Sequence, residues 1–356
     1  MSDQAVPYPS AVLDHTLAAP LTRIDDAALA RVGEAGWGLD VVSVRRLDTE
    51  RDDTVLLTHT AGRHVLKVAH PLDDPSVLEL QCAALQHAAR RDPALPLPHV
   101  VPDRDGALLR VVAGAQGEPR LARLLGYLEG VVLDYGATTR AQRVAVGVAA
   151  GRLSLALADL EHPAADRRLA WDLQQVGTLR PLLRHVEDAG VRRLVGAELD
   201  AFDDHVGAEL RASRQQVVHH DINADNVVVD PTSASYVTGI LDFGDIVRSS
   251  LVGDLAVAMC YAVGAGDSLR RDDVDLWEAP YDVAHGYRSI RDLTPTEVAL
   301  LPGLVRLRFA QRLLLNSWLA SSDPSNAHYT GRSIARSVTA LARLASTPPP
   351  ADREGA

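Results

Sequence analysis

The chain has 356 residues, of which 47% are hydrophobic, and its formal net charge is −11 at pH 7. This acidic balance argues against a nucleic acid partner and mildly favours a cationic ligand. The two cysteines give no disulfide framework. Residues 1–10 do not have the pattern of a signal peptide, and no run reaches the ~20 apolar residues of a membrane span. Composition therefore predicts a cytoplasmic protein without a membrane segment, long enough for two lobes.

Residues 25–128 are predicted to form a small, mostly antiparallel β lobe with one helix. A turn at residues 61–63 separates two of its short strands, and the strand at residues 64–69 contains Lys67, the one lysine of the chain. Lysine is a compact point charge and arginine a planar fork, so a lysine kept in an arginine-rich chain indicates a site that needs the ammonium group. The alternative is a chance survivor on a strand edge.

The helix predicted in this lobe begins near residue 74. Asp74 takes the N-cap position and Pro75 the first helical position. The apolar stripe of the helix is formed by Leu78, Cys82 and Leu85. Glu79 falls at the edge of that stripe and is predicted to form an ion pair with Lys67. Otherwise Glu79 is an ordinary solvated helix residue.

After Gly130 the chain is predicted to become mainly helical, which gives a larger lobe over residues 129–346. Apolar residues recur at helical spacing in residues 138–160, 179–195, 197–214, 255–263, 276–290, 294–321 and 332–345. Short strands interrupt this pattern near residues 217–241. Residues 347–356 begin with a proline run and are predicted to be a disordered tail. The predicted class is α+β with two lobes.

Two short segments carry the most specific chemistry. Asp221 lies five residues before Asn226 in a polar loop between β-branched runs, and Asp242 follows the next apolar strand. Mg²⁺ takes few protein oxygens and completes its coordination with phosphate and water, so Asn226 and Asp242 suffice to hold it. Asp221 is then free to orient an acceptor hydroxyl and take its proton. Each residue alone is an ordinary turn former, but their order and spacing together predict a kinase active site.

The earlier segments fit the same interpretation. In kinases a strand lysine contacts the α- and β-phosphates and a helix glutamate orients that lysine, which are the roles predicted for Lys67 and Glu79. Residues 124–130 form an apolar strand that runs into a glycine-marked hinge, where Leu125 and Tyr127 are candidates to contact a nucleotide base. Because backbone atoms would bind the base there, the side chains do not decide between ATP and GTP.

The chain resembles the aminoglycoside phosphotransferase and choline kinase superfamily, the small-molecule branch of the protein-kinase-like fold. The nearest likeness within it is to hydroxylysine kinases and to phosphotransferase domains fused to class III aminotransferases. The resemblance covers about residues 28–346. The matching segments are Glu50-Arg51-Asp52, Trp171-Asp172-Leu173, His219 to Asn226, Leu241 to Asp245, and Asp254-Leu255-Ala256.

This resemblance implies further roles. Asp254 corresponds to a structural carboxylate that ties the catalytic loop to the following helix. Asp245 supports the metal site or forms a turn, and both interpretations stay open. Residues 43–54 contain no glycine, so backbone N–H groups and a polar side chain would hold the phosphates, and Arg51 either contacts a phosphate or remains a charge on a turn. His220 stands where the superfamily usually has glycine, and its side chain could point outward.

The late helices are predicted to form the acceptor wall, with candidates Trp171, Asp172, Trp277, Glu278, Tyr287, Arg306, Arg308, Asn326 and Tyr329. Each of them could instead serve packing or the surface. The resemblance implies an amino alcohol or hydroxy amino acid such as hydroxylysine, homoserine or ethanolamine. Arg306 or Arg308 could then hold a substrate carboxylate in a bidentate grip.

Two other functions stay open at this point. The acidic balance also suits an aminoglycoside acceptor, which would make the protein an antibiotic-inactivating enzyme. A pseudokinase that only binds nucleotide would normally have lost the base, the metal ligands or the lysine, and this chain keeps all of them. The sequence leaves the oligomeric state undecided.

Overall fold

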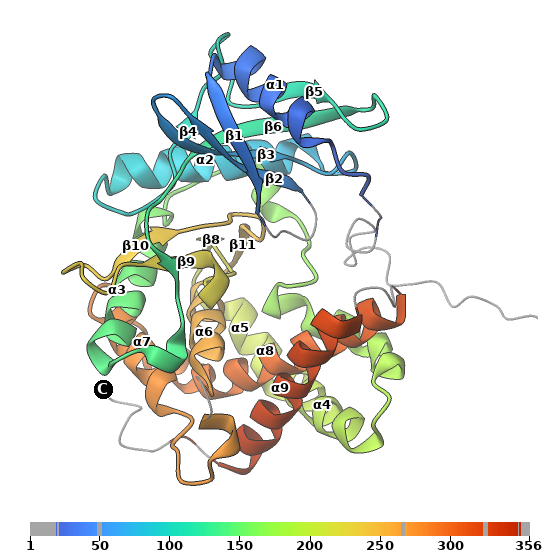
Figure 1. Ribbon diagram of the computed structural model, residues 1–356. Helices are drawn as coiled ribbons and strands as arrows, with labels where there is room; N and C mark the ends of the chain where they lie inside the picture. Colours follow the sequence, from blue (N-terminus) through green and yellow to red (C-terminus); the bar gives the residue numbers. More distant parts are fainter. Residues whose placement is uncertain are drawn as a thin grey trace, which may run out of the picture.

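The computed structural model describes residues 19, 21–47, 52–264, 268–322, 327–347 and 349, with the backbone alone at 327–330 and 332. An antiparallel sheet with two helices occupies one end of the molecule, and a larger, mostly helical region the other (Figure 1). The predicted order of a small β lobe followed by a helical lobe is therefore found. The predicted disordered tail begins at Thr347, and nearly all of it lies outside the described residues.

The small lobe contains one sheet with strand order β1-β2-β3-β6-β4, and β5 also pairs with β6. All of these pairs are antiparallel. Its strands are β1 (Val41–Arg46), β2 (Asp53–His59), β3 (Gly62–Val68), β4 (Val100–Val101), β5 (Arg110–Ala113) and β6 (Pro119–Gly126). In the register of β3 and β6, Lys67 lies opposite Arg123. The sheet therefore places two cations side by side at its centre.

Within its described residues the small lobe has two helices, α1 (Asp26–Trp37) and α2 (Pro75–Arg91), where the sequence predicted one. The prediction missed α1 because the segment contains glycines, which disfavour helix by ~1 kcal/mol each. The side chain of Asp25 caps α1 by accepting the Ala28 N–H. Gly33 has a packing reason, since a Cβ there would lie 2.7 Å from the Leu57 side chain. Close approach of α1 to the sheet explains the glycine.

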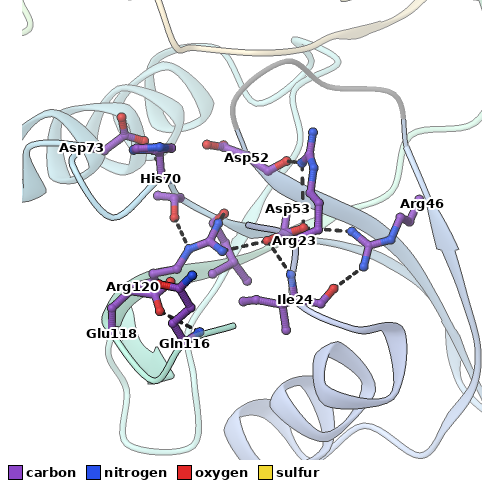
Figure 2. A network of polar contacts seen from close by, with 12 residues as sticks. Arg23, Ile24, Arg46, Asp52, Asp53, His70, Asp73, Gln116, Glu118 and Arg120 are labelled. Carbon is purple, nitrogen blue, oxygen red and sulfur yellow. Dashed lines mark hydrogen bonds and ion pairs between the residues drawn. The ribbon is translucent and has the colours of Figure 1, made fainter. Parts of the chain in front are cut away.

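One buried carboxylate ties this lobe together (Figure 2). Asp53 pairs with Arg120 at 2.7 Å and with Arg46 at 2.8 Å, and it accepts the Ile24 N–H. The side chains of Asp53 and Arg120 are both 0% exposed. We call this group, with Arg23 at 3.8 Å, the Asp53 network. It joins β2, β6 and the segment before α1.

The larger lobe contains two small sheets, with orders β10-β9-β7 and β11-β8. Their strands are β7 (Val131–Val132), β8 (Gln215–Val218), β9 (Val227–Val229), β10 (Val237–Ile240) and β11 (Val247–Ser250). Its helices are α3 (Arg140–Ala156), α4 (Ala189–Ala201), α5 (Gly207–Ala212), α6 (Leu251–Ala262), α7 (Glu278–Arg288), α8 (Pro295–Ser322) and α9 (Ala327–Ser346). Among the helices of the described residues, none combines the length and apolar run needed to cross a membrane.

Two helix predictions in this lobe were wrong in detail. Residues 179–195 do not form one helix, because a 3₁₀ segment that contains Pro181 covers Leu173–His185 and α4 starts afresh after the Asp188 cap. A proline inside a helix removes one backbone donor and disturbs the preceding turn. Residues 197–214 divide into the end of α4, a π-helical turn at Phe202–Val206, and α5. The other predicted helices are confirmed with shifted ends.

Candidate active site

The loop between β8 and β9 fixes the orientation of Asp221. The side-chain amides of Asn223 and Asn226 donate to Asp221 Oδ2 at 2.9 and 2.6 Å. The Asn226 amide also donates to the Asp221 carbonyl at 3.0 Å. The other carboxylate oxygen, Oδ1, faces the guanidinium of Arg308 at 3.8 Å. One oxygen of Asp221 is thus held by the loop, and the second faces Arg308 without a described hydrogen bond.

The electrostatic environment of Asp221 is strongly negative. Its side chain is 22% exposed. Burial, followed by the charge of Asp245, raises the pKa of Asp221 to about 8, and Asp242 acts in the same direction. Arg308 opposes this rise. Carboxylates that repel one another at a common site are stabilised by a cation placed among them.

Asp242 lies beside the loop that carries Asp221 because the N–H of Leu241, the residue before it, donates to the Asn226 carbonyl at 2.7 Å. Asp242 has a φ of 53° and accepts the Gly244 N–H at 2.9 Å. Its Oδ2 pairs with the ammonium of Lys67 at 3.1 Å. The Lys67 charge holds the pKa of Asp242 well below its usual range. The structure thus brings Lys67 of the small lobe to Asp242 of the large lobe.

Two histidines and Asp254 shape the start of the loop. The His219 ring donates to the Leu241 carbonyl at 3.0 Å. The backbone N–H of His220 donates to Asp254 Oδ1 at 2.7 Å, so the predicted tie between this loop and α6 is confirmed. Burial raises the pKa of Asp254 to about 6. The large lobe therefore holds the loop through a buried carboxylate on a helix.

The idea that the His220 side chain points outward was wrong. His220 is fully buried and has a φ of 63°, the left-handed region that favours the glycine usual in related sequences. Its Nε2 accepts the Leu173 N–H at 3.3 Å. Burial lowers the pKa of His220 to about 3, so the ring is neutral at pH 7. The ring connects the catalytic loop to the segment that begins at Trp171.

The predicted ion pair between Glu79 and Lys67 is not formed. Glu79 is exposed on α2, and Lys67 instead pairs with Asp242 and, at 3.7 Å, with Asp52. The stripe residues Leu78, Cys82 and Leu85 are buried as predicted, and Glu79 lies outside the buried face. The polar residue that α2 turns inward is Gln81, which accepts a hydrogen bond from Arg123 at 2.8 Å. The sequence missed Asp52 and Gln81 because their contacts depend on tertiary packing.

The hinge candidates lie at the end of β6. Leu125 is half-buried and pairs with Val65 of β3 and Val100 of β4. The guanidinium of Arg63 lies 4.5 Å from the centre of the Tyr127 ring. Their contact with a nucleotide base stays a prediction. Arg51, the candidate phosphate ligand of the β1–β2 loop, lies outside the described residues.

The donor set at the catalytic loop fits a hard divalent cation bound with a nucleotide. Asn226 uses its side-chain N–H₂ group on Asp221, which leaves its side-chain oxygen without a described hydrogen bond. Within the described part of the chain, no group of three or more His, Cys, Asp or Glu side chains forms a metal cage. A cation that shares its coordination with phosphates and water needs no such cage. The carboxylates of Asp221, Asp242 and Asp245 supply the negative charge that attracts such a cation.

The acceptor-wall candidates divide into two groups. Trp277 and Tyr287 are buried, with hydrogen bonds to the Thr347 carbonyl and to Ser154, and Arg306 pairs with Glu198. The contacts of these three residues are with other parts of the fold, away from Asp221. Arg308 lies beside Asp221, with its guanidinium 5.0 Å from the Trp171 ring. Of the other candidates, Asp172 is buried and Glu278 pairs with Arg143, whereas Asn326 lies outside the described residues and Tyr329 has no described side chain.

The sequence did not single out Arg312 and Tyr261, which lie next to this site. The Arg312 guanidinium is 4.8 Å from the Tyr261 ring centre, and the charge of Asp221 acts on both side chains. The one available signal was spacing, because Arg312 follows Arg308 by four residues and therefore shares its face of the helix.

The site belongs to an enzyme that transfers a phosphoryl group, with a sheet lobe and a helical lobe meeting at Lys67 and Asp242. The phosphotransferase enzyme family matches residues 43–293, and the chain belongs to that family. It is accordingly a phosphotransferase, as the sequence predicted.

Individual kinases of known name are also similar to this chain in sequence or in structure. Hydroxylysine kinase of Danio rerio is 26% identical over 324 residues, which cover 86% of this chain and 88% of that protein. The solved amicoumacin kinase hAmiN, in complex with AMP-PNP, Ca²⁺ and Ami, aligns with a TM-score of 0.68 at 15% identity, covering 92% of this chain and 95% of that one. A microcompartment-associated aminopropanol kinase aligns with a TM-score of 0.63 at 23% identity, covering 90% and 97%. The two structural likenesses confirm the two-lobed, protein-kinase-like fold.

Proposed function

We propose that this enzyme is a Mg²⁺-dependent kinase that transfers the γ-phosphoryl group of ATP or GTP to a hydroxyl of a small, amine-bearing molecule, a hydroxy amino acid or an amino alcohol. The observation that carries the proposal is the arrangement of Asp221. The loop holds its Oδ2 through two amides, while Oδ1 makes no described hydrogen bond and faces Arg308, and the charge of Asp242, which pairs with Lys67, acts on Asp221. This is the arrangement that a base for phosphoryl transfer requires.

The residues take the following roles. Asp221 Oδ1 accepts the hydrogen of the acceptor hydroxyl and orients its oxygen for attack. Asn226 and Asp242 would hold the divalent cation, which when bound neutralises charge on the phosphates. Lys67, now paired with Asp242 at 3.1 Å, is close enough to exchange that partner for a nucleotide phosphate.

The remaining assignments rest on position. Leu125 and Tyr127 at the end of β6 would border the nucleotide base, and Arg51 in the β1–β2 loop would contact a phosphate. We propose lobe boundaries of 25–128 and 129–346, and a cytoplasmic location, which the use of a nucleoside triphosphate supports. The acceptor class is supported by the likeness to hydroxylysine kinase and to an aminopropanol kinase.

The proposal is tested by measuring nucleoside diphosphate release with Mg²⁺, ATP or GTP, and a panel of acceptors. The panel contains hydroxylysine, homoserine, ethanolamine, an aminopropanol and aminoglycosides, and mass spectrometry identifies the phosphorylated product. We expect release that depends on a hydroxy amino acid or amino alcohol. Phosphorylation of aminoglycosides alone would contradict the acceptor class. Nucleotide binding with no acceptor-dependent release from any member would contradict the kinase assignment.

A further inference from the structure

One face of α8 carries two arginines, Arg308 next to the proposed base Asp221 and Arg312 one helical turn further along. Arg308 and Arg312 are four residues apart, so they lie on the same face with an axial separation of ~6 Å. Arg308 is 1% exposed and 3.8 Å from Asp221. It donates to the Trp171 carbonyl at 2.6 Å and to the Gln311 side chain at 2.9 Å. Arg308 is thus already engaged and acts as a positioning residue for Asp221.

Arg312, one turn further, makes its described direct contacts with neutral groups, and the charge of Asp221 acts on it from further away. Its guanidinium lies 4.8 Å from the Tyr261 ring centre and 5.8 Å from that of Phe309. It donates to the Ser333 hydroxyl at 3.2 Å and hydrogen-bonds the Cys260 thiol. Burial raises the pKa of that thiol, so Cys260 supplies no negative charge at pH 7. Among the described residues, no carboxylate forms an ion pair with Arg312.

Arg336 of α9 adds a third positive charge to the same place. It donates to the Val263 carbonyl at 3.1 Å, which is again a neutral partner. Burial, followed by the charge of Arg312, lowers the pKa of Arg336. We call Arg308, Arg312 and Arg336 the arginine face. Arg308 has Asp221 beside it, whereas half-buried Arg312 and exposed Arg336 form no ion pair with a carboxylate of the described residues, so a ligand anion would find two uncompensated cations there.

We propose that Arg312 binds a carboxylate of the acceptor substrate, so that the enzyme selects hydroxy amino acids over amino alcohols. The inference rests on the proposed function. The Ser333 hydroxyl accepts from Arg312 and from the Asn316 amide at 3.0 Å, which leaves its own hydrogen to donate to the same carboxylate. Arg336 supplies additional positive charge. A planar carboxylate matches the two parallel N–H groups of a guanidinium.

Arg306 on the same helix provides a matched control. It already has a carboxylate partner, Glu198 of α4, at 3.1 Å. Arg306 and Arg312 therefore differ in the one property on which the inference depends, namely a counter-ion within the chain.

The test compares homoserine with its decarboxylated counterpart, an aminopropanol, in the wild type and in the variants Arg312→Gln, Arg312→Lys and Arg306→Gln. We expect Arg312→Gln to lower kcat/KM for homoserine about 10- to 100-fold, mainly through KM, with little change for the aminopropanol. Arg312→Lys should recover part of the loss because it keeps the charge. Arg306→Gln should leave the ratio between the two substrates unchanged.

The outcomes separate this inference from the proposed function. A wild type that phosphorylates both acceptors equally well, or an Arg312→Gln variant that loses both equally, would overturn the carboxylate site and leave the kinase in place. If no acceptor is phosphorylated, calorimetry with AMP-PNP present decides. Homoserine binding that is lost in Arg312→Gln would support the carboxylate site and remove the proposed function. Equal or absent binding in both proteins would overturn the inference.

Discussion

Arg120 of the Asp53 network is buried and Arg312 of the arginine face is half-buried, but the two charges have different partners. In the Asp53 network, Arg120 uses its N–H groups on Asp53, the Ala69 carbonyl and the Val68 carbonyl, at 2.7 to 2.8 Å (Figure 2). The anion is part of the chain. On the arginine face, the direct contacts of Arg312 within the described residues are a hydroxyl, a thiol and two rings.

The difference distinguishes charges that serve the fold from charges that serve a ligand. A fully paired buried arginine stabilises one conformation and has no N–H group left for a substrate. A half-buried arginine with neutral direct partners keeps its charge available to an incoming anion. Burial alone therefore does not identify a functional arginine, whereas the source of its counter-ion does.

The largest expected effect comes from Asp221, the carboxylate at the catalytic end of the arginine face. Asp221→Asn should lower kcat by about 10²- to 10⁴-fold, because it removes the base while keeping the hydrogen-bonding shape. Nucleotide affinity, measured by calorimetry, should stay within about twofold, since Asp221 does not hold the phosphates.

Asp225→Asn is the matched control for this prediction. Asp225 lies in the same loop, is exposed, and has no hydrogen bond or ion pair to the described residues. Normal turnover in Asp225→Asn with loss in Asp221→Asn would support the assigned base. Normal turnover in Asp221→Asn would show that the base is another group.

Removing the anion of the paired region should damage the fold. Asp53→Ala leaves Arg120 buried without its charge partner, and such a loss destabilises by about 3–5 kcal/mol. Urea unfolding followed by circular dichroism measures the change. The control is Asp105→Ala, because Asp105 pairs with Arg110 but is 79% exposed, and exposed pairs contribute about 0–1 kcal/mol. Equal effects of the two substitutions would contradict the structural role of the Asp53 network.

Local spacing explains which parts of the site the sequence could predict. Asp221, Asn226 and Asp242 lie in short segments joined by neighbouring strands, and their order was enough to predict that they belong to one site. Their catalytic and metal-binding roles stay predictions. Lys67 was identifiable because it is the one lysine of the chain. For Asp254, the likeness to related sequences supplied the role, and the structure confirms it.

Long-range packing explains the rest. The helical pattern of α2 placed Glu79 near the buried face, but the angle at which α2 lies on the sheet turns Gln81 inward instead. Arg312 was missed because its surroundings come from α6 and α9, which are distant in sequence. The pattern of α1 was hidden by its glycines, whose purpose is visible only against the sheet.

Asp254 differs from both regions, because it is a buried carboxylate with no arginine partner among the described residues. Asp254→Ala leaves the His220 N–H without an acceptor and should destabilise by about 1–3 kcal/mol. Asp254→Asn keeps an acceptor oxygen and should destabilise less. Urea unfolding of both variants at pH 7 measures the difference. Equal losses in the two variants would contradict the role assigned to the His220 hydrogen bond.

The pKa of Asp254 adds a dependence on pH. Its folded-state pKa of about 6 lies above the unfolded value of ~3.9, so the folded state binds the proton more tightly. The stabilising contribution of this group is therefore complete below about pH 4 and is lost as the pH rises through 6. Relative to Asp254→Asn, the wild type should lose stability between pH 4 and pH 7. The opposite slope would show that an unrecognised cation pairs with Asp254.

The smallest effect is expected at Glu79, which tests whether Lys67 takes its partners from α2 or from the loops. Because Glu79 is exposed and Lys67 pairs with Asp52 and Asp242, Glu79→Gln should change stability by less than about 0.5 kcal/mol. It should also leave the KM for nucleotide within about twofold.

Asp52→Asn is the informative companion, since it removes a carboxylate that lies 3.7 Å from both Lys67 and Arg123. Those two cations face each other across β3 and β6, and Asp52 is the anion between them, so its loss should raise the KM for nucleotide several-fold. A large rise in Glu79→Gln and none in Asp52→Asn would mean that α2 moves inward when the nucleotide binds, and that the Glu79–Lys67 pair belongs to the bound state.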